Sequence, residues 1–166
     1  MQIEVPIEVD VQAGPILDLF WVFADDSAAG DGDGYVDPGE SIDAVLFVEN
    51  IGEADANSVT GTFSFVGTTG VTAVTDGVLD FGLISAGFFW FDFGSFDVDP
   101  AAVDGLELPF EVELWDAAGH HWLFTFSLTV EARSSIRGTI TDAVTTLPLS
   151  GISVKAVCAT DSGSDI

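Results

Sequence analysis

The strongest constraint on this chain is the alternation of apolar and polar residues in three of its segments. Between residues 3 and 11 every odd position is apolar, and three of the even positions between them are acidic. Residues 106–114 repeat the alternation with the even positions apolar, and residues 124–130 repeat it with threonine and serine between. A period of two residues is that of a β-strand with one buried and one solvated face. These segments therefore predict three strands.

Further strands are predicted at residues 15–23, 41–49, 57–66, 71–75, 78–83 and 88–98. Eighteen glycines punctuate the chain, and no stretch shows a sustained period of 3.6 residues. Short strands separated by frequent turns are typical of two antiparallel sheets packed face to face. We therefore expect an all-β protein built as an antiparallel β-sandwich, with an extra strand at its N-terminus.

The charge of the chain is one-sided, since 28 acidic residues face 3 basic ones and the formal net charge is −25. All three basic residues lie beyond position 132, so residues 1–132 contain no lysine or arginine. Nucleic acid and anionic membranes both require a basic surface, so we exclude them as partners. A compact body with this charge repels itself, and we expect a hard divalent cation to neutralise part of it.

Composition also bears on order, compartment and membrane insertion. Hydrophobic residues make up 48% of the chain, with 14 Phe and 4 Trp, which indicates a folded protein. No run of 18 apolar residues occurs, so we expect no membrane insertion. No signal peptide is visible at the N-terminus, so we expect that it was removed or that the chain is part of a longer protein. Cys158 is the one cysteine, which excludes an internal disulfide and leaves the redox compartment open.

Two predicted strands, residues 16–23 and 88–93, are apolar on both faces. One explanation is a strand that is buried on one side and covered by a loop on the other. The other is an aromatic surface that binds another subunit, with Phe89, Trp90 and Phe91 at the interface.

Residues 25–40 form an acidic, glycine-rich loop that could bind calcium. Its six carboxylates are Asp25, Asp26, Asp31, Asp33, Asp37 and Glu40. Calcium takes six to eight oxygen ligands and accepts both carboxylates and backbone carbonyls. Glycines on either side of Asp33 permit the positive φ angles that a tight loop needs. Tyr35 could add its carbonyl and Glu40 could close the site, while the alternative is a solvated acidic turn. The loop is not an EF-hand, because Ile42 stands where that motif has glutamate.

The run Gly32-Asp-Gly-Tyr-Val-Asp-Pro-Gly-Glu40, followed by a strand and by Glu49-Asn-Ile-Gly52, resembles a known family. It is similar to the calcium-stabilised, Ig-like β-sandwich modules of secreted bacterial and archaeal proteins. The resemblance covers about residues 15–132 and implies an extracellular, non-catalytic role with bound Ca²⁺. By position it implies Asp26, Asp31, Asp33 and Glu40 as side-chain ligands and Tyr35 as a carbonyl ligand. Asp25 is a further possible ligand, and so is Asp37, whose expected role is to shape the Pro-Gly turn.

A second resemblance begins at Ile136. Residues 137–155 are similar to the opening of a carboxypeptidase regulatory-like domain, of which only about 30 residues are present. The basic residues also begin here. We therefore divide the chain into an N-terminal strand at 1–13, an acidic sandwich at 14–132 and a partial β segment at 133–166.

Other acidic and histidine clusters are weaker candidates. His120 and His121 are adjacent in a strand and point to opposite faces, so they do not suit one ion. Four aspartates that lie close in sequence are candidates for a second calcium site: Asp92, Asp97, Asp99 and Asp104. Two others, Asp76 and Asp80, are expected to be turn residues. No nucleophile elbow, zinc-protease motif or P-loop occurs, so we expect no enzyme.

The sequence thus predicts a calcium-stabilised structural module on the cell surface or outside the cell. Its N-terminal strand has a complete apolar face, formed by Ile3, Val5, Ile7, Val9 and Val11. We expect this strand to complete a sheet of a neighbouring subunit, which would build a head-to-tail filament. Two alternatives are a piece of a tandem array of β-domains and a carbohydrate- or ligand-binding module of a secreted enzyme or adhesin.

Overall fold

The computed structural model describes residues 14–131 and Thr145. The chain divides into two units, residues 1–133 and 134–166, and the account below concerns the first. The predicted N-terminal strand at 1–13 and, apart from Thr145, the predicted β segment at 133–166 lie outside the described residues.

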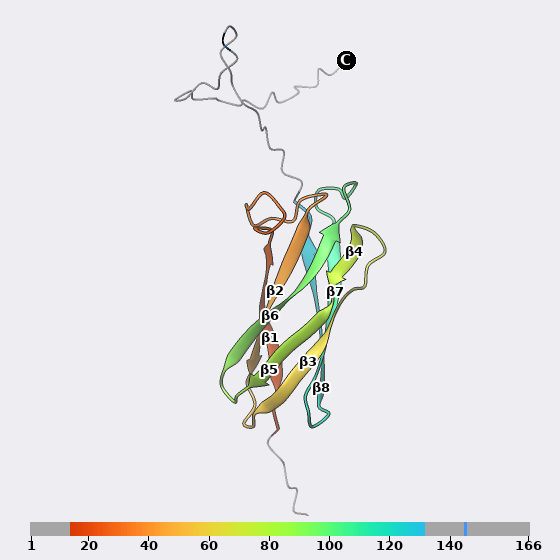
Figure 1. Cartoon of the computed structure of the whole chain (residues 1–166). Coiled ribbons are helices and arrows are strands. Elements are labelled where there is room, and N and C mark those ends of the chain that lie inside the picture. Colours follow the sequence, from red (N-terminus) through yellow and green to blue (C-terminus); the bar gives the residue numbers. More distant parts are fainter. Residues whose placement is uncertain (1–13, 132–144, 146–166) are drawn as a thin grey trace, which may run out of the picture. The chain divides into compact units, whose positions relative to one another are not determined.

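Eight strands make up the described part of the first unit (Figure 1). They are β1 (Leu17–Asp25), β2 (Ser41–Asn50), β3 (Ala56–Phe65), β4 (Val71–Asp76), β5 (Val78–Ile84), β6 (Phe89–Val98), β7 (Glu107–Trp115) and β8 (His121–Thr129). Each begins and ends within three residues of a strand predicted from the sequence. Among the described residues, no helix is long and apolar enough to span a membrane.

The strands form two antiparallel four-stranded sheets, with the orders β1-β2-β6-β4 and β5-β3-β7-β8. The neighbours β1-β2-β6 and β3-β7-β8 reproduce the Greek-key pairing of an immunoglobulin-type sandwich. Between β3 and β6 the chain changes sheet at every strand, because β4 pairs with β6 and β5 pairs with β3. The expected all-β, Ig-like antiparallel sandwich is therefore confirmed.

Alternating side chains fill the space between the sheets. In β2 and β7 every second residue is buried, as the two-residue period predicts. Phe110 lies at the centre of the core, and its ring centroid is 4.7 Å from that of Phe96 and 4.8 Å from that of Phe63. Offset or edge-on ring pairs at these distances add stabilisation beyond the area that they bury.

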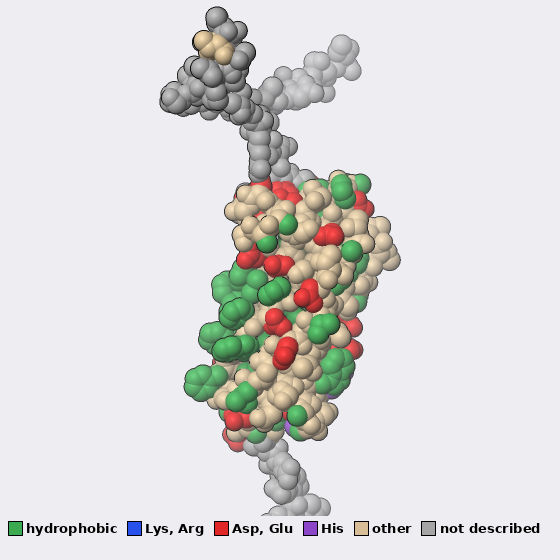
Figure 2. Space-filling model, viewed as in Figure 1, with side chains coloured by type: hydrophobic (Ala, Val, Ile, Leu, Met, Phe, Trp, Pro, Cys, Tyr) green, Lys and Arg blue, Asp and Glu red, His purple; other side chains and the backbone are tan. Residues whose placement is uncertain are grey.

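A bulge in β1 explains why residues 16–23 look apolar on both faces. Leu19 pairs with Val48 but Trp21 pairs with Phe47, so Phe20 is an extra residue in the ladder. Leu19 therefore packs against the core while both Phe20 and Trp21 lie on the outer face, about half exposed. In Figure 2 hydrophobic side chains gather along this side of the sandwich. No described segment covers them, so the explanation that a loop covers this face is wrong for residues 14–131.

The predicted interface residues Phe89, Trp90 and Phe91 do not share one face. Phe89 and Phe91 lie on the outer face of β6, opposite Glu49 and Phe47 of β2. Trp90 points to the opposite side of the strand. It lines a separate surface pocket together with Leu83 and Ile84 at the end of β5, and Phe89 also borders this pocket.

The contacts of Asn50 and Gly52 explain the sequence of the Asn50-Ile-Gly52 turn. Its fully buried side chain accepts the N–H groups of Ile16 and Gly52 and donates to the carbonyls of Ala54 and Ile84. One amide thus joins the start of β1, the β2–β3 turn and the end of β5. A Cβ at Gly52 would lie 2.5 Å from the backbone of Ile16, which excludes other residues there.

We predict that Asn50→Asp destabilises the sandwich by about 3 kcal/mol or more. The carboxylate cannot donate to the two carbonyls, and each buried carbonyl without a partner costs about 1–3 kcal/mol. Urea unfolding at neutral pH measures the effect. Asn57→Asp is the matched control, because Asn57 is exposed and the charge change is the same. Equal losses in the two variants would contradict the proposed role of Asn50.

Candidate metal site

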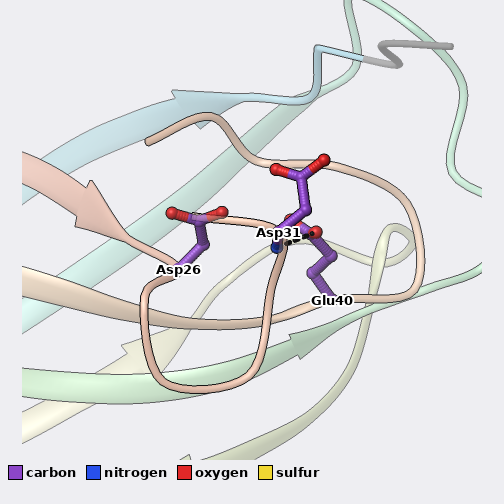
Figure 3. A group of neighbouring side chains, drawn as sticks. All are labelled: Asp26, Asp31 and Glu40. Carbon is purple, nitrogen blue, oxygen red and sulfur yellow. Dashed lines mark hydrogen bonds between the residues drawn. The ribbon is translucent and has the colours of Figure 1, made fainter. Parts of the chain in front are cut away.

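The acidic loop joins β1 to β2 at one end of the sandwich. Asp26 directly follows the last residue of β1, and Glu40 directly precedes the first residue of β2. The loop between them folds back, so that Asp31 lies beside both (Figure 3). Two strand ends of one sheet therefore fix the outer members of the group.

Asp26 organises the loop. Its carboxylate is 2% exposed and accepts three backbone N–H groups, from Gly32 (2.7 Å) and Asp33 (3.2 Å) at Oδ2 and from Gly34 (3.0 Å) at Oδ1. Burial is the largest influence on its pKa and raises it, but the N–H groups of Gly34, Gly32 and Asp33 together bring the pKa below its ordinary value. Gly32 and Gly34 have φ angles of 79° and 81°, which other residues adopt only with strain.

Two overlapping groups of carboxylates result. Oxygens of Asp26, Asp31 and Glu40 lie within 4.8 Å of one another, and so do oxygens of Asp31, Asp33 and Asp37. Asp31 belongs to both groups. Among the described residues, the carboxylates that could together hold a metal ion belong to these five residues.

Glu40 is the member whose charge is least satisfied. Its Oε1 accepts the N–H of Asp31 at 2.9 Å, whereas its Oε2 is buried and has no hydrogen-bond partner. Burial raises the pKa of Glu40, and the nearby charges of Asp26, Asp37 and Asp31 raise it further. A buried acceptor without a donor is rare, and a cation is one partner that satisfies it.

The remaining predicted ligands have different positions. Asp25 lies outside both groups, and its carboxylate accepts the N–H of Ser27 in a separate turn. Tyr35 donates its N–H to Oδ1 of Asp33. Asp37 was expected to shape the turn, and its carbonyl does accept the N–H of Glu40. The residue is 8% exposed, and its carboxylate belongs to the second group.

The other clusters considered in the sequence do not assemble. Asp97 accepts the hydroxyl of Ser41, and Asp92 accepts the N–H of Asp80, so no second acidic group forms from these residues within the described part of the chain. Asp76 ends β4 and accepts the N–H of Val78, as a turn residue does. The expectation that Asp80 is a turn residue is wrong, because Asp80 lies within β5, pairs with Thr60 of β3 and accepts the N–H of Gly82 beside an irregularity in that pairing.

The adjacent histidines have separate partners. Nδ1 of His120 lies 2.8 Å from Asp116, whereas His121 stacks on Trp115. Although burial acts in the opposite direction, hydrogen bonds from His120 lower the pKa of Asp116.

The acidic loop also pairs with the residue that follows β8. The sequence did not predict this pairing. Val36 forms a parallel bridge with Val130, and its carbonyl accepts the N–H of Glu131 at 3.0 Å. Both valines are buried. The pairing joins residues 94 positions apart, and no local pattern announces it. Because Val36 lies between Asp33 and Asp37, the acidic group adjoins the point where the chain leaves the sandwich.

Comparison with known proteins adds no functional assignment. No family model matches the chain, and no curated protein matches its sequence. Among solved structures it is similar to the ASH/PapD-like domain of human CEP192 (PapD-like domain 7). The alignment has 18% identity, covers 80% of this chain and 100% of that chain, and has a TM-score of 0.35. The fold assignment therefore depends on the strand pairing above.

We predict that Asp26→Asn destabilises the protein in a chelating buffer at pH 7, and destabilises it less at pH 3. Because the native state lowers the pKa of Asp26 from 3.8, its stabilisation is present above pH 3.8 and is lost as the pH falls through the lower native value. Three N–H groups contribute, so the loss at pH 7 is about 1–3 kcal/mol. Denaturant unfolding at a series of pH values measures it. A difference between variant and wild type that does not change between pH 7 and pH 3 would contradict this role.

Proposed function

We propose that this chain is a non-catalytic structural module of an extracellular or cell-surface protein, and that calcium bound in the acidic loop stabilises it. The observation that carries the proposal is the buried, unpartnered Oε2 of Glu40 within a group of carboxylates. In a chain with a net charge of −25, this is a position where a cation would satisfy both a local acceptor and an excess of charge.

The donor set favours calcium over other metals. All candidate side-chain ligands are carboxylates, which suit hard cations, whereas zinc prefers cysteine and histidine. Ligand oxygens on opposite sides of a calcium ion lie about 4.6–5.2 Å apart. The oxygens of each group lie within 4.8 Å of one another, so both groups fit within such a shell.

The position of the loop suits a module in a linear assembly. Within residues 14–131 the chain enters at one end of the sandwich and leaves at the other (Figure 1). The acidic loop is bound to the exit through Val36 and Val130. An ion held by Asp33 and Asp37, on either side of Val36, would fix the backbone where the next segment begins.

An open apolar groove between β1 and β8 supports the strand-donation hypothesis. Leu19, Val22, Phe124 and Phe126 line it, and all four are only partly buried. β1 and β8 are edge strands of their sheets, so they can accept a further strand through backbone hydrogen bonds. We propose that the apolar face of residues 3–11 from a neighbouring copy fills this groove. Repetition of that contact would build a filament.

A carbohydrate- or ligand-binding module is the second candidate. The observation that favours it is the exposed aromatic surface on the outer face of β1 and β6, where Trp21, Phe89 and Phe91 are each more than half exposed. Aromatic side chains are common in the lining of ligand sites.

We predict that calcium raises the melting temperature of the chelator-treated protein by roughly 10 °C when its concentration is about 100 times the dissociation constant. Ligand binding to the native state alone contributes about 2.7 kcal/mol at that ratio. Asp33→Asn should abolish the response. Asp76→Asn is the matched control, because both aspartates accept the N–H two residues ahead and both substitutions remove one charge. Identical melting curves with calcium and with chelator would contradict the assignment.

We predict opposite effects of Glu40→Gln with and without metal. In chelator at pH 7 the variant should melt at a higher temperature than the wild type. Since the native state raises the pKa of Glu40 from 4.5, its ionisation destabilises the fold above that pH, and the difference disappears below pH 4.5. In saturating calcium the order should reverse, because the variant loses a charged ligand. Thermal melting in both buffers tests this, and a variant that is less stable than the wild type in chelator at pH 7 would contradict it.

We predict that Ile7→Asp prevents head-to-tail assembly while leaving the calcium response intact. The substitution places a charge on the apolar face of the proposed donor strand. Glu8→Gln, on its polar face, is the control and should assemble like the wild type. Electron microscopy and sedimentation of the full chain measure assembly. A wild type that never polymerises, or an Ile7→Asp variant that polymerises normally, would end the strand-donation hypothesis.

A further inference from the structure

The outer face of β1, β2 and β6 carries a continuous cluster of aromatic side chains, here called the aromatic face. Its members are Phe20, Trp21, Phe47, Phe89, Phe91 and Phe93. Trp21, Phe47 and Phe91 lie opposite one another across the three strands. Phe20 enters the same face through the bulge in β1, and its ring lies 5.8 Å from that of Phe89. Five paired strand residues and one bulge residue thus share one surface.

Carboxylates border this face but do not enter its centre. Asp18 pairs with Glu49 at one end, and Asp25 pairs with Asp43 at the other. The two rows between them, Trp21–Phe47–Phe91 and Phe23–Val45–Phe93, contain no charged residue. In a chain with 28 acidic residues, an uncharged band of this kind indicates a surface that contacts something apolar.

The exposed area matches one side of a protein–protein contact. Five of the six rings are between 43% and 55% exposed, and Phe47 at their centre is half-buried. Since an aromatic side chain offers about 150–250 Å², the aromatic face presents about 500–600 Å². A stable interface buries about 800 Å² on each partner, of which the apolar centre is the larger part. The face and a narrow rim around it are therefore sufficient for a dimer.

The ring geometry disfavours a sugar platform. Trp21 and Phe91 stack against Phe47 at 5.1 Å and 5.5 Å, with interplanar angles of 31° and 28°. The rings pack against one another, so their faces are occupied by neighbouring rings instead of lying open for a sugar. Polar groups that converge on a ligand, which such sites require, are also absent from the two central rows.

We propose that the aromatic face is the interface between two copies of this chain, packed sheet against sheet. A second copy supplies an uncharged aromatic surface of the same size, and a two-fold contact places it opposite the first. Acidic rows then meet at the rim, so association must overcome repulsion between like charges. Salt screens that repulsion over about 3 Å at 1 M and about 10 Å at 0.1 M, so added salt strengthens this dimer. The contact lies on the outer face of one sheet and shares Phe20 and Trp21 with the lining of the groove between β1 and β8. Its other residues lie on β2 and β6, outside that groove, so the contact would join filaments side by side.

Sedimentation of the full chain carrying Ile7→Asp tests the proposal, because this background removes strand donation. We expect a monomer–dimer equilibrium that shifts toward the dimer between 0.1 M and 1 M NaCl. Phe91→Thr, two strands away from the groove, should raise the dissociation constant by at least about tenfold. Val78→Thr is the control, because Val78 is 75% exposed on the other sheet and should leave dimerisation unchanged.

Trp21→Thr provides a second variant at the margin of the face and should weaken the dimer in the same direction. A protein that stays monomeric at both salt concentrations overturns the proposal, and so does equal weakening by Phe91→Thr and Val78→Thr. A monomer whose tryptophan fluorescence responds to soluble oligosaccharides overturns it in favour of a sugar site. Strand donation is judged separately, by whether the chain with the native Ile7 forms filaments.

Discussion

The absence of basic side chains from residues 1–132 is the constraint on which the rest of this structure depends. Its carboxylates have no lysine or arginine within the same segment with which to form ion pairs, and several accept backbone N–H groups. Asp26 accepts three of them, and four further aspartates each accept the N–H two residues ahead, namely Asp33, Asp76, Asp80 and Asp99. Among the described residues, Oε2 of Glu40 is the buried side-chain oxygen that has no hydrogen-bond donor. That oxygen lies in the candidate metal site.

Most of the fold could be predicted from the sequence because burial in a two-layer sandwich follows a two-residue period. The alternation in residues 106–114 predicted which face of β7 is buried. For β2 only the strand itself was predicted, because residues 44–48 are all apolar and do not reveal the buried face. The bulge at Phe20 could not be predicted, because a single extra residue leaves no local signal in a strand that is apolar throughout. The orientation of Trp90 was missed for a related reason, since three adjacent aromatic residues do not reveal which of them faces outward.

The candidate site was predicted in its residues but not in its arrangement. The resemblance to calcium-stabilised modules implied Asp26, Asp31, Asp33 and Glu40, and the structure places these near one another and near Asp37 in two overlapping groups. The pairing of Val36 with Val130 depends on how β8 ends and could not be inferred from the loop alone. Asp92, Asp97 and Asp99 are also close in sequence, but their carboxylates do not form a group that could hold a metal ion among the described residues.

These features describe a module that presents separate surfaces for separate tasks. The acidic loop adjoins the exit of the chain, the groove between β1 and β8 offers unpaired strand edges, and the aromatic face lies on the outside of one sheet. All three are compatible with assembly, and none requires catalysis. In the proposed function, a calcium ion would fix the loop that joins β1 to β2 and pairs with the end of β8.

The most direct test of this account is nuclear magnetic resonance of the full chain during titration of the chelator-treated protein with calcium. If the loop binds calcium, the backbone amides of Asp31, Gly32, Asp33 and Gly34 shift and saturate together, and the amide of Glu131 follows because it donates to Val36. Small shifts spread over acidic residues throughout the sandwich, without saturation in the loop, would indicate a diffuse counterion atmosphere. That result would contradict a calcium-stabilised module.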